Sequence, residues 1–258
     1  MNDYIGSINA RDLVFKTNSG EKMRILSSIS STGALLFVNG GDMVVNGMTV
    51  GHGSGASQTN TAIGNSALTY NTTGNANTAN GYSALTFNTI GSINTANGVF
   101  ALSYNTTGSS NTANGGGVLT YNTTGNSNTA NGVFALYYNT TGSFNTANGS
   151  YALISNTSGS GNIAMGYESL RTATGVDFQT AIGYQALKNS TTGTQNLALG
   201  YQAGSSITTG SNNIAIGYNA QVPSGILSNQ LNIGNWIYGS GGDIGIGTSS
   251  PGSKLTVS

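Results

Sequence analysis

Very few residues of this chain could carry out acid–base or nucleophilic chemistry. Its 258 residues include seven acids, seven bases, a single histidine and no cysteine. The histidine, His52, lies in the glycine-rich stretch 51–55, without another candidate catalytic or ligating residue beside it. Catalytic triads and imidazole metal sites depend on histidine, and thiolate sites depend on cysteine. We therefore expect no catalytic site, no metal site and no cofactor.

Two carboxylates, Glu168 and Asp177, are the only acids between residues 56 and 222. Glycoside cleavage usually needs two carboxyl groups that flank the scissile bond. The pair falls in an irregular stretch, where a recurring glycine has moved to Gly175, so an insertion decorated with surface charge explains it as well. We expect the chain not to be an enzyme, and a polysaccharide depolymerase remains the alternative.

Aromatic residues recur at a fixed spacing and could form a binding surface. The main row is Tyr70, Phe87, Tyr104, Tyr121 and Tyr138. A smaller group is Phe100, Phe134 and Tyr151. Rings spaced by one strand can stack on sugar rings or contact a protein receptor. The alternative, which we prefer, places the rings in the core or between chains, because a leucine two positions earlier shares their side of a strand.

A row of asparagines has the same spacing: Asn80, Asn97, Asn114, Asn131 and Asn148. Later copies of the pattern carry Ile, Met or Leu at this place. Stacked amides can hydrogen-bond along a row and satisfy one another in a polar interior that a partner surface encloses. They could equally sit in Asn-Gly turns that face water, and the sequence leaves both interpretations open.

These residues belong to a repeat of 17 residues that recurs ten times without an insertion. An Asn or Gln opens each copy, at Asn60, Asn77, Asn94, Asn111, Asn128, Asn145, Asn162, Gln179, Asn196 and Asn213. A glycine follows four residues later in every copy. A fixed period of this kind indicates a chain that stacks one unit on the next.

The repeat has the pattern of short strands. Residues 213–218, Asn-Ile-Ala-Ile-Gly-Tyr, place Ile214 and Ile216 on one face and Ala215 on the other. We expect a second short strand over 101–104 and a turn over 105–108, so that a coil has two strands and two turns. The predicted fold is all-β, a parallel β-solenoid or β-roll of ten 17-residue coils, on the order of 50 Å long at the usual strand spacing.

The chain divides into three predicted regions. Residues 1–55 read as a small β meander with Asn-Gly turns at 39–40 and 46–47, residues 56–222 form the solenoid, and residues 223–258 form a C-terminal β cap. Caps are expected, because an open stack would leave strand edges unpaired. Asn-Thr-Thr and Asn-Thr-Ser triplets match glycosylation signals, but their recurrence at one turn position favours a structural role.

The repeats at 213–220 (Asn-Ile-Ala-Ile-Gly-Tyr-Asn-Ala) and 180–187 (Thr-Ala-Ile-Gly-Tyr-Gln-Ala-Leu) resemble the head repeats of trimeric autotransporter adhesins. Residues 243–257 are similar to the segment that precedes an intramolecular trimerisation chaperone in phage tail fibres, and residues 12–18 and 21–25 to a module of the same fibres. The resemblance implies a left-handed parallel β-roll and a homotrimer. The 17-residue period and the Asn-for-Ile exchange depart from the adhesin pattern.

Composition narrows the possible partners. The net charge is zero and the few Lys and Arg residues are scattered, so we expect no nucleic acid partner. The longest aliphatic stretch, near 34–38, is too short to span a membrane. We expect a non-enzymatic extracellular or virion fibre segment that binds a host glycan or protein receptor. A bacterial adhesin head is the second hypothesis, and an ice-binding solenoid the third, although its paired threonines are adjacent and so point to opposite faces.

Overall fold

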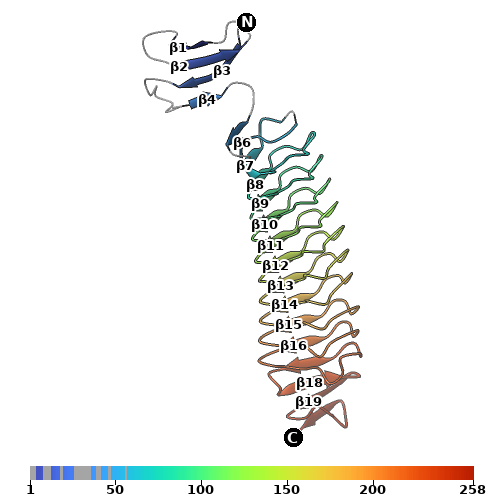
Figure 1. The fold of residues 1–258 in the computed structure, drawn as a ribbon. Coiled ribbons are helices and arrows are strands. Elements are labelled where there is room, and N and C mark those ends of the chain that lie inside the picture. The colour runs from blue at the N-terminus through green and yellow to red at the C-terminus, as the bar shows by residue number, and fades with distance from the viewer. Residues whose placement is uncertain are drawn as a thin grey trace.

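The computed structural model describes residues 4–7, 13–17, 20–25, 36–38, 42–45, 48–55 and 57–258. Its described residues contain strands and turns but no helix, and the coils are stacked along one axis (Figure 1). The fold is therefore the all-β solenoid predicted from the sequence. The strands are β1 Tyr4–Ser7, β2 Leu13–Thr17, β3 Gly20–Ile25, β4 Leu36–Val38, β5 Met43–Val45, β6 Met48–Gly51, β7 Thr61–Asn65, β8 Thr78–Asn80, β9 Thr95–Asn97, β10 Thr112–Asn114, β11 Thr129–Asn131, β12 Thr146–Asn148, β13 Ile163–Met165, β14 Thr180–Ile182, β15 Leu197–Leu199, β16 Ile214–Ile216, β17 Leu231–Ile233, β18 Ile237–Ser240, β19 Asp243–Ile246 and β20 Leu255–Val257.

Strands β7 to β17 pair in parallel and in register, each with the equivalent residues of the next coil. Thr112, for example, lies opposite Thr129, and Ala113 lies opposite Ala130. Parallel strands with identical neighbours are what a constant 17-residue period requires, because a slip of one residue would turn every side chain to the other face.

Both ends of the solenoid sheet change direction. At the N-terminal end, β6 pairs antiparallel with β7 and with β5. At the C-terminal end, β18 pairs antiparallel with β17 and with β19. Strands β1 to β4 form a separate four-stranded antiparallel sheet, so the predicted meander is divided between two sheets. The Asn-Gly turns at 39–40 and 46–47 lie outside the described residues.

Each coil contains one short strand rather than two, so the predicted second strand was wrong. In the expected strand at 101–104 the chain forms turns, and Leu102 has φ 51°. Its N–H nevertheless donates to the carbonyl of Val118 in the next coil, at 3.0 Å. The coil-to-coil backbone pairing is thus retained, while the positive φ directs the leucine into a sharp inward corner.

The core is narrow and is built from one inward residue per strand and one leucine per turn. Ala113 of β10 and Leu119 of the following turn are both fully buried, and the equivalent residues of other coils repeat this arrangement. Alanine suits the inward strand position because the opposite wall of the coil is close. The alternation predicted at 213–218 is confirmed, with Ala215 inside and Ile214 outside.

Two ladders of buried asparagine complete the core. We number coil positions from 1, the Asn or Gln that opens each copy. At position 1, Asn94 accepts a hydrogen bond from the backbone N–H of Asn111, at 3.0 Å. At position 12, the Nδ2 of Asn105 donates to the Oδ1 of Asn88 at 2.7 Å and to the carbonyl of Gly108 at 2.9 Å. The glycosylation triplets begin at the position-12 asparagines Asn71, Asn105, Asn122, Asn139 and Asn156, and the burial of these residues supports the structural role that their recurrence favoured.

Glycine recurs at position 5 because successive coils approach closely there. Gly98 has φ 136°, and a Cβ on it would lie 2.3 Å from the carbonyl oxygen of Gly115. No other residue fits both the backbone conformation and the space. The regular glycine read from the sequence is therefore a consequence of backbone stacking.

Candidate functional site

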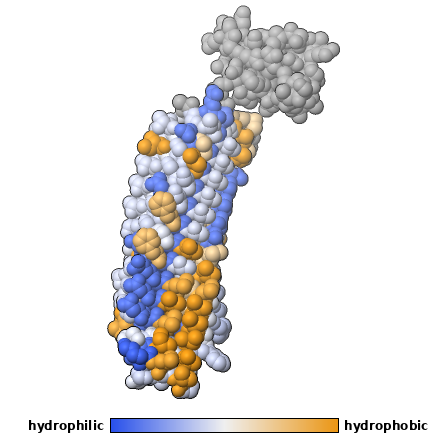
Figure 2. Space-filling model, turned by 180° about the vertical axis from the view of Figure 1, so that it is seen from behind, coloured by the Kyte–Doolittle hydropathy of each residue, from blue (hydrophilic) through white to orange (hydrophobic). Residues whose placement is uncertain are grey.

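The outward residues of β8 to β17 form a continuous surface along the rod, which we call the strand face. It is polar in the N-terminal half, where each strand turns a Thr and an Asn outward. It becomes apolar from β13 onward, through Ile163, Met165, Ile182, Leu197, Leu199, Ile214, Ile216, Leu231 and Ile233. Figure 2 shows the hydrophobic residues gathered over the C-terminal half of the rod. Met165 is 40% exposed and Leu199 is 44% exposed, so this apolar surface is open in the single chain.

The asparagine row lies on the polar half of the strand face. Asn97 donates to Asn114 at 2.8 Å, Asn114 to Asn131 at 2.8 Å, and Asn131 to Asn148 in the same manner. Asn80 is exposed and the others are half-buried. The amides therefore hydrogen-bond along the rod, but outside the coil and not in its interior. Their enclosure by a partner stays a prediction.

The main aromatic row forms a stack on the outside of the coils. Ring centroids are 5.1 Å apart for Tyr70 and Phe87, 4.9 Å for Phe87 and Tyr104, and 5.2 Å for Tyr104 and Tyr121. The stack ends with Tyr138, 5.9 Å from Tyr121. Placement of these rings in the core of the coil was wrong: Tyr70 is 56% exposed, whereas Leu68 is fully buried. The two residues diverge because the segment is a turn with Leu68 at φ 51°. A contact between chains remains a prediction.

A second stack follows the strand ends of the later coils. Tyr167, Tyr184, Tyr201 and Tyr218 stack with centroids 5.3, 5.2 and 5.1 Å apart. Sequence reasoning did not assign a role to this row. The signal was present in the recurring Gly-Tyr pair after each late strand, and it borders the apolar half of the strand face.

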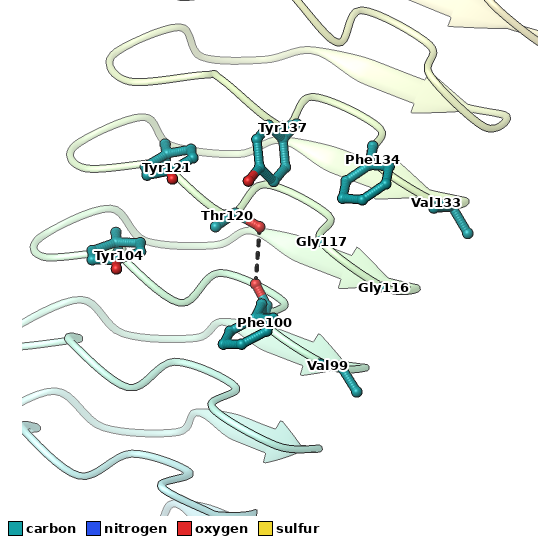
Figure 3. Close-up of a pocket in the computed structure, with 10 residues that line it drawn as sticks. All are labelled: Val99, Phe100, Tyr104, Gly116, Gly117, Thr120, Tyr121, Val133, Phe134 and Tyr137. Carbon is teal, nitrogen blue, oxygen red and sulfur yellow. Dashed lines mark hydrogen bonds between the residues drawn. The ribbon is translucent and has the colours of Figure 1, made fainter.

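The smaller aromatic group is interrupted. Phe100 and Phe134 occupy position 7 of their coils, but the coil between them carries Gly117 there, after Gly116. The interruption opens a surface cavity of about 380 Å³ (Figure 3). Beyond it, Phe134 and Tyr151 approach to 5.8 Å between ring centroids.

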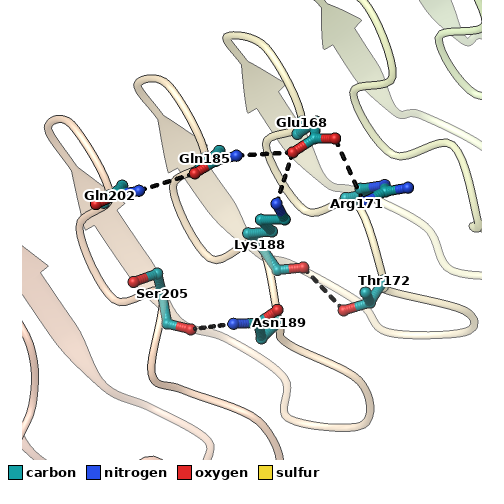
Figure 4. Close-up of polar contacts among 8 residues, drawn as sticks. All are labelled: Glu168, Arg171, Thr172, Gln185, Lys188, Asn189, Gln202 and Ser205. Carbon is teal, nitrogen blue, oxygen red and sulfur yellow. Dashed lines mark hydrogen bonds and ion pairs between the residues drawn. The ribbon is translucent and has the colours of Figure 1, made fainter.

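Glu168 is the centre of a small polar cluster (Figure 4). Its carboxylate accepts from Lys188 at 2.7 Å, from Arg171 at 3.3 Å and from the amide of Gln185 at 2.8 Å. Gln202 extends the row by donating to Gln185 at 2.8 Å. Glu168 is only 7% exposed, so the predicted surface decoration is wrong for this residue, and the coil holds its register without an insertion.

Electrostatics of the cluster favour an ionised carboxylate. Burial raises the pKa of Glu168, but the hydrogen bonds from Lys188 and Gln185 and the charge of Arg171 outweigh it, so the pKa lies below its ordinary value. Asp177 has other partners and accepts from the backbone N–H of Ser160 at 2.7 Å. The structure gives the two acids no shared contact.

His52 is exposed, and it has hydrogen-bond partners within the chain. Its Nδ1 lies 2.6 Å from the carbonyl oxygen of Asn60, and its backbone N–H donates to Asp42 at 2.6 Å. No group of three or more potential metal ligands of the His, Cys, Asp and Glu types occurs within the residues that the structure describes. In the same part of the chain, no helix is long and apolar enough to cross a membrane.

The chain was compared with known proteins at three levels. No protein-family model matches it, no curated protein matches it, and no solved structure matches it.

Proposed function

We propose that the chain is a non-enzymatic segment of an extracellular homotrimeric fibre, of the kind found in phage tails, and that it presents a receptor-binding surface on a stiff rod. The observation that carries the proposal is the apolar half of the strand face. Soluble monomers rarely leave a large contiguous apolar patch exposed. An exposed apolar surface that extends over strands β13 to β17 is typical of an interaction site.

Further copies of the same chain are the best partners for this surface. The patch contains no charge, and its residues repeat once per coil along the rod. Identical rods placed side by side in register bring identical residues together at every level, as cyclic symmetry requires. The resemblance of the repeats to trimeric adhesin heads favours three chains. The amide row of Asn97 to Asn148 would then continue the same contact as a hydrated polar half.

The oligomeric state tests the assembly. Light scattering of the intact chain is expected to give about three times the 26.0 kDa mass of one chain. Ile214→Arg places like charges together in the apolar contact and is expected to produce monomers. Thr192→Arg, on an exposed turn of the same half of the rod, is the matched control and is expected to remain trimeric. A parent protein of monomer mass, or a trimer unaffected by Ile214→Arg, contradicts the proposal.

Receptor binding is assigned to the aromatic rows. The main row offers stacked, half-exposed ring edges over five coils, next to phenol hydroxyl groups that can form hydrogen bonds. Such a surface suits a host glycan or a protein receptor. Loss of binding to host cells after paired Tyr104→Ala and Tyr121→Ala substitutions, with trimer mass retained, is the expected result.

The alternatives have separate tests. A bacterial adhesin head would use the same surfaces, and the neighbouring genes would distinguish it from a phage fibre. An ice-binding solenoid is less favoured because hydroxyls of the Thr-Thr turns are engaged, as where Thr106 donates to the carbonyl of Thr123 at 2.9 Å. Thermal hysteresis measures that activity directly. Retention of any polysaccharide cleavage after Glu168→Gln dismisses the carboxylate pair as its source.

A further inference from the structure

One coil of the rod lacks two side chains that its neighbours carry. The adjacent coils have Val99 and Phe100 on one side and Val133 and Phe134 on the other. The coil between them has Gly116 and Gly117 instead. Because the flanking coils keep their large residues, the omission leaves a cavity of about 380 Å³ rather than a general narrowing of the rod.

Aromatic rings form most of the wall of this cavity (Figure 3). Phe100 and Phe134 lie in the coils on either side, and Tyr104 and Tyr121 of the main row line one flank. Thr120 lies at the base, 4% exposed, with its hydroxyl donating to the carbonyl of Phe100 at 3.1 Å. The base is thus fixed by the fold, while the rings around it are partly exposed.

Tyr137 is the second unusual residue of the site. It stands at position 10, where the preceding coils have Thr or Ser, and it lines the cavity from the next coil. Its ring makes edge-to-face contacts with Tyr121 and Phe134, with centroids 5.1 Å apart in each case. Tyr137 is thus a large residue at a position where the preceding coils have a small one. It lies next to the coil in which Gly116 and Gly117 take the place of large residues. The two departures from the repeat together shape one cavity.

The open space lies over Gly116. A Cβ on Gly117 would meet the ring of Phe134 at 2.6 Å, so that ring already rests against the Gly117 backbone. A Cβ on Gly116 would meet nothing within 4 Å. The site is consequently a pocket with one packed side and one free side.

The chemistry of the pocket selects an uncharged ligand. No Asp, Glu, Lys or Arg occurs between residues 43 and 167, and no histidine lines the pocket, so a charged group entering it would lose water without gaining a partner. The polar groups are the phenol hydroxyls of Tyr104, Tyr121 and Tyr137. Burial, with the neighbouring Tyr121 hydroxyl, raises the pKa of Tyr137, which keeps this phenol protonated and able to donate. Ring faces beside hydroxyl donors and acceptors fit a molecule with C–H faces and a rim of hydroxyl groups.

We propose that the pocket centred on Gly116 and Gly117 binds one uncharged sugar ring of a glycan. The sugar's C–H face stacks on the aromatic wall, and its hydroxyls pair with the phenols. The volume is at the lower end of ligand sites, which span roughly 300–1,000 Å³, and suits one or two sugar units. This inference rests on the receptor-binding role proposed above and gives that role a location and a ligand class.

Saturation-transfer NMR on the intact chain tests the proposal. The probes are lactose, cellobiose, maltose and N,N′-diacetylchitobiose, with galacturonate and glucuronate as charged counterparts and p-cresol as a mimic of a protein side chain. Saturation of the C–H protons of at least one neutral sugar, and of neither uronate, is expected. Transfer to p-cresol alone, or to none of the neutral sugars, overturns the proposal.

Variants locate the binding. Gly116→Tyr fills the free side with the residue that other coils carry at the same position, namely Tyr82, Tyr167, Tyr184, Tyr201 and Tyr218, and it is expected to abolish binding. Tyr121→Ala removes one wall and is expected to weaken binding by about tenfold. Phe144→Ala, at an aromatic residue that is 70% exposed and lies outside the pocket and both aromatic rows, is the matched control and leaves binding unchanged.

Survival of binding in Gly116→Tyr, or a loss in Phe144→Ala equal to that in Tyr121→Ala, overturns the pocket as the site. Circular dichroism and light scattering of the same samples establish that the variants are folded and report their mass. A trimer that binds no sugar contradicts the sugar-binding pocket but not the fibre assembly. A monomer that binds sugar contradicts the fibre assembly but not the pocket.

Discussion

Replacing a buried asparagine of the position-12 ladder by alanine is expected to cost more in the middle of the ladder than at its end. Asn122 lies in the middle and Asn156 at the end, and both are fully buried. The substitution and the space it empties are the same at both sites. A difference in the free energy of unfolding therefore reports the hydrogen bonds of the ladder.

The larger loss of unfolding free energy is expected for Asn122→Ala, because Asn122 makes three side-chain hydrogen bonds. Its Nδ2 donates to Asn105 at 2.7 Å and to the carbonyl of Gly125 at 2.9 Å, and its Oδ1 accepts from Asn139 at 2.7 Å. Asn122→Ala removes all three bonds and leaves the Oδ1 of Asn105 buried without a donor. At about 1 kcal/mol per bond and about 1–3 kcal/mol for the orphaned acceptor, the loss is about 4–6 kcal/mol.

Asn156 makes fewer side-chain hydrogen bonds than Asn122. The next coil has Ala173 at position 12, so the Oδ1 of Asn156 is already buried without a partner. Asn156→Ala removes two bonds, to Asn139 at 2.8 Å and to Gly159 at 3.0 Å. It also removes one orphaned acceptor while creating another on Asn139. The expected loss is about 2 kcal/mol.

Urea unfolding followed by far-UV circular dichroism, at one protein concentration, measures both losses. Repeat arrays need not unfold in one step, so hydrogen exchange of amides in the neighbouring coils provides a local measurement alongside it. Equal losses at the two sites, or a larger loss for Asn156→Ala, would refute the reasoning that the ladder bonds stabilise the core.

Three further predictions concern Gln179 at position 1 of its coil, the glycines, and the polar cluster around Glu168. Gln179→Asn is expected to change the stability by less than about 1 kcal/mol, because the shorter side chain returns an acceptor to the N–H of Asn196 but loses the bond from Nε2 to Ser190 at 2.8 Å. Gly98→Ala is expected to destabilise it by more than about 2 kcal/mol, whereas Gly116→Ala, whose Cβ meets nothing, changes stability little. Glu168→Gln is expected to cost about 1 kcal/mol at neutral pH. Since the lowered pKa of Glu168 contributes stability above its unfolded-state pKa and loses it as pH falls through the folded-state pKa, that difference disappears in acid.

The same urea assay checks each of the three. A stability change well above about 1 kcal/mol for Gln179→Asn rejects this balance of one bond gained and one bond lost. Similar costs at Gly98 and Gly116 would show that close coil approach does not explain the glycine. A cost of Glu168→Gln that is constant from neutral to acid pH would assign it to packing rather than to the ion pairs.

Much of the coil was predictable because its period constrains it. The alternation at 213–218 identified the strand, and the recurring glycine identified its end. The second strand at 101–104 was not predictable in this way. The Ala-Leu pair has the composition of a buried strand, but Leu102 is directed inward by a positive φ that no local pattern of apolar residues encodes.

The candidate surfaces were likewise predictable from the sequence only in part. Sequence spacing found the rows of Tyr70 and Asn97, and in-register stacking follows from spacing alone. Their exposure did not follow, because it depends on which way the turn after the strand bends. The pocket could not be predicted from the sequence either. It combines Gly116 and Gly117 with Tyr137 of the next coil, and the sequence gives no measure of the space between them.

The order of the residues by itself determined a stack of identical coils, the alternation of alanine with its neighbours along the strand and the shortage of catalytic groups, because each depends only on period and residue type. Tertiary structure alone decided that the buried asparagines are those at positions 1 and 12, that the aromatic rows lie outside, and that Glu168 is held by Lys188 and Arg171. The physical reason is that burial and pairing depend on the direction of each side chain in a closed coil, which is fixed only when the turns close.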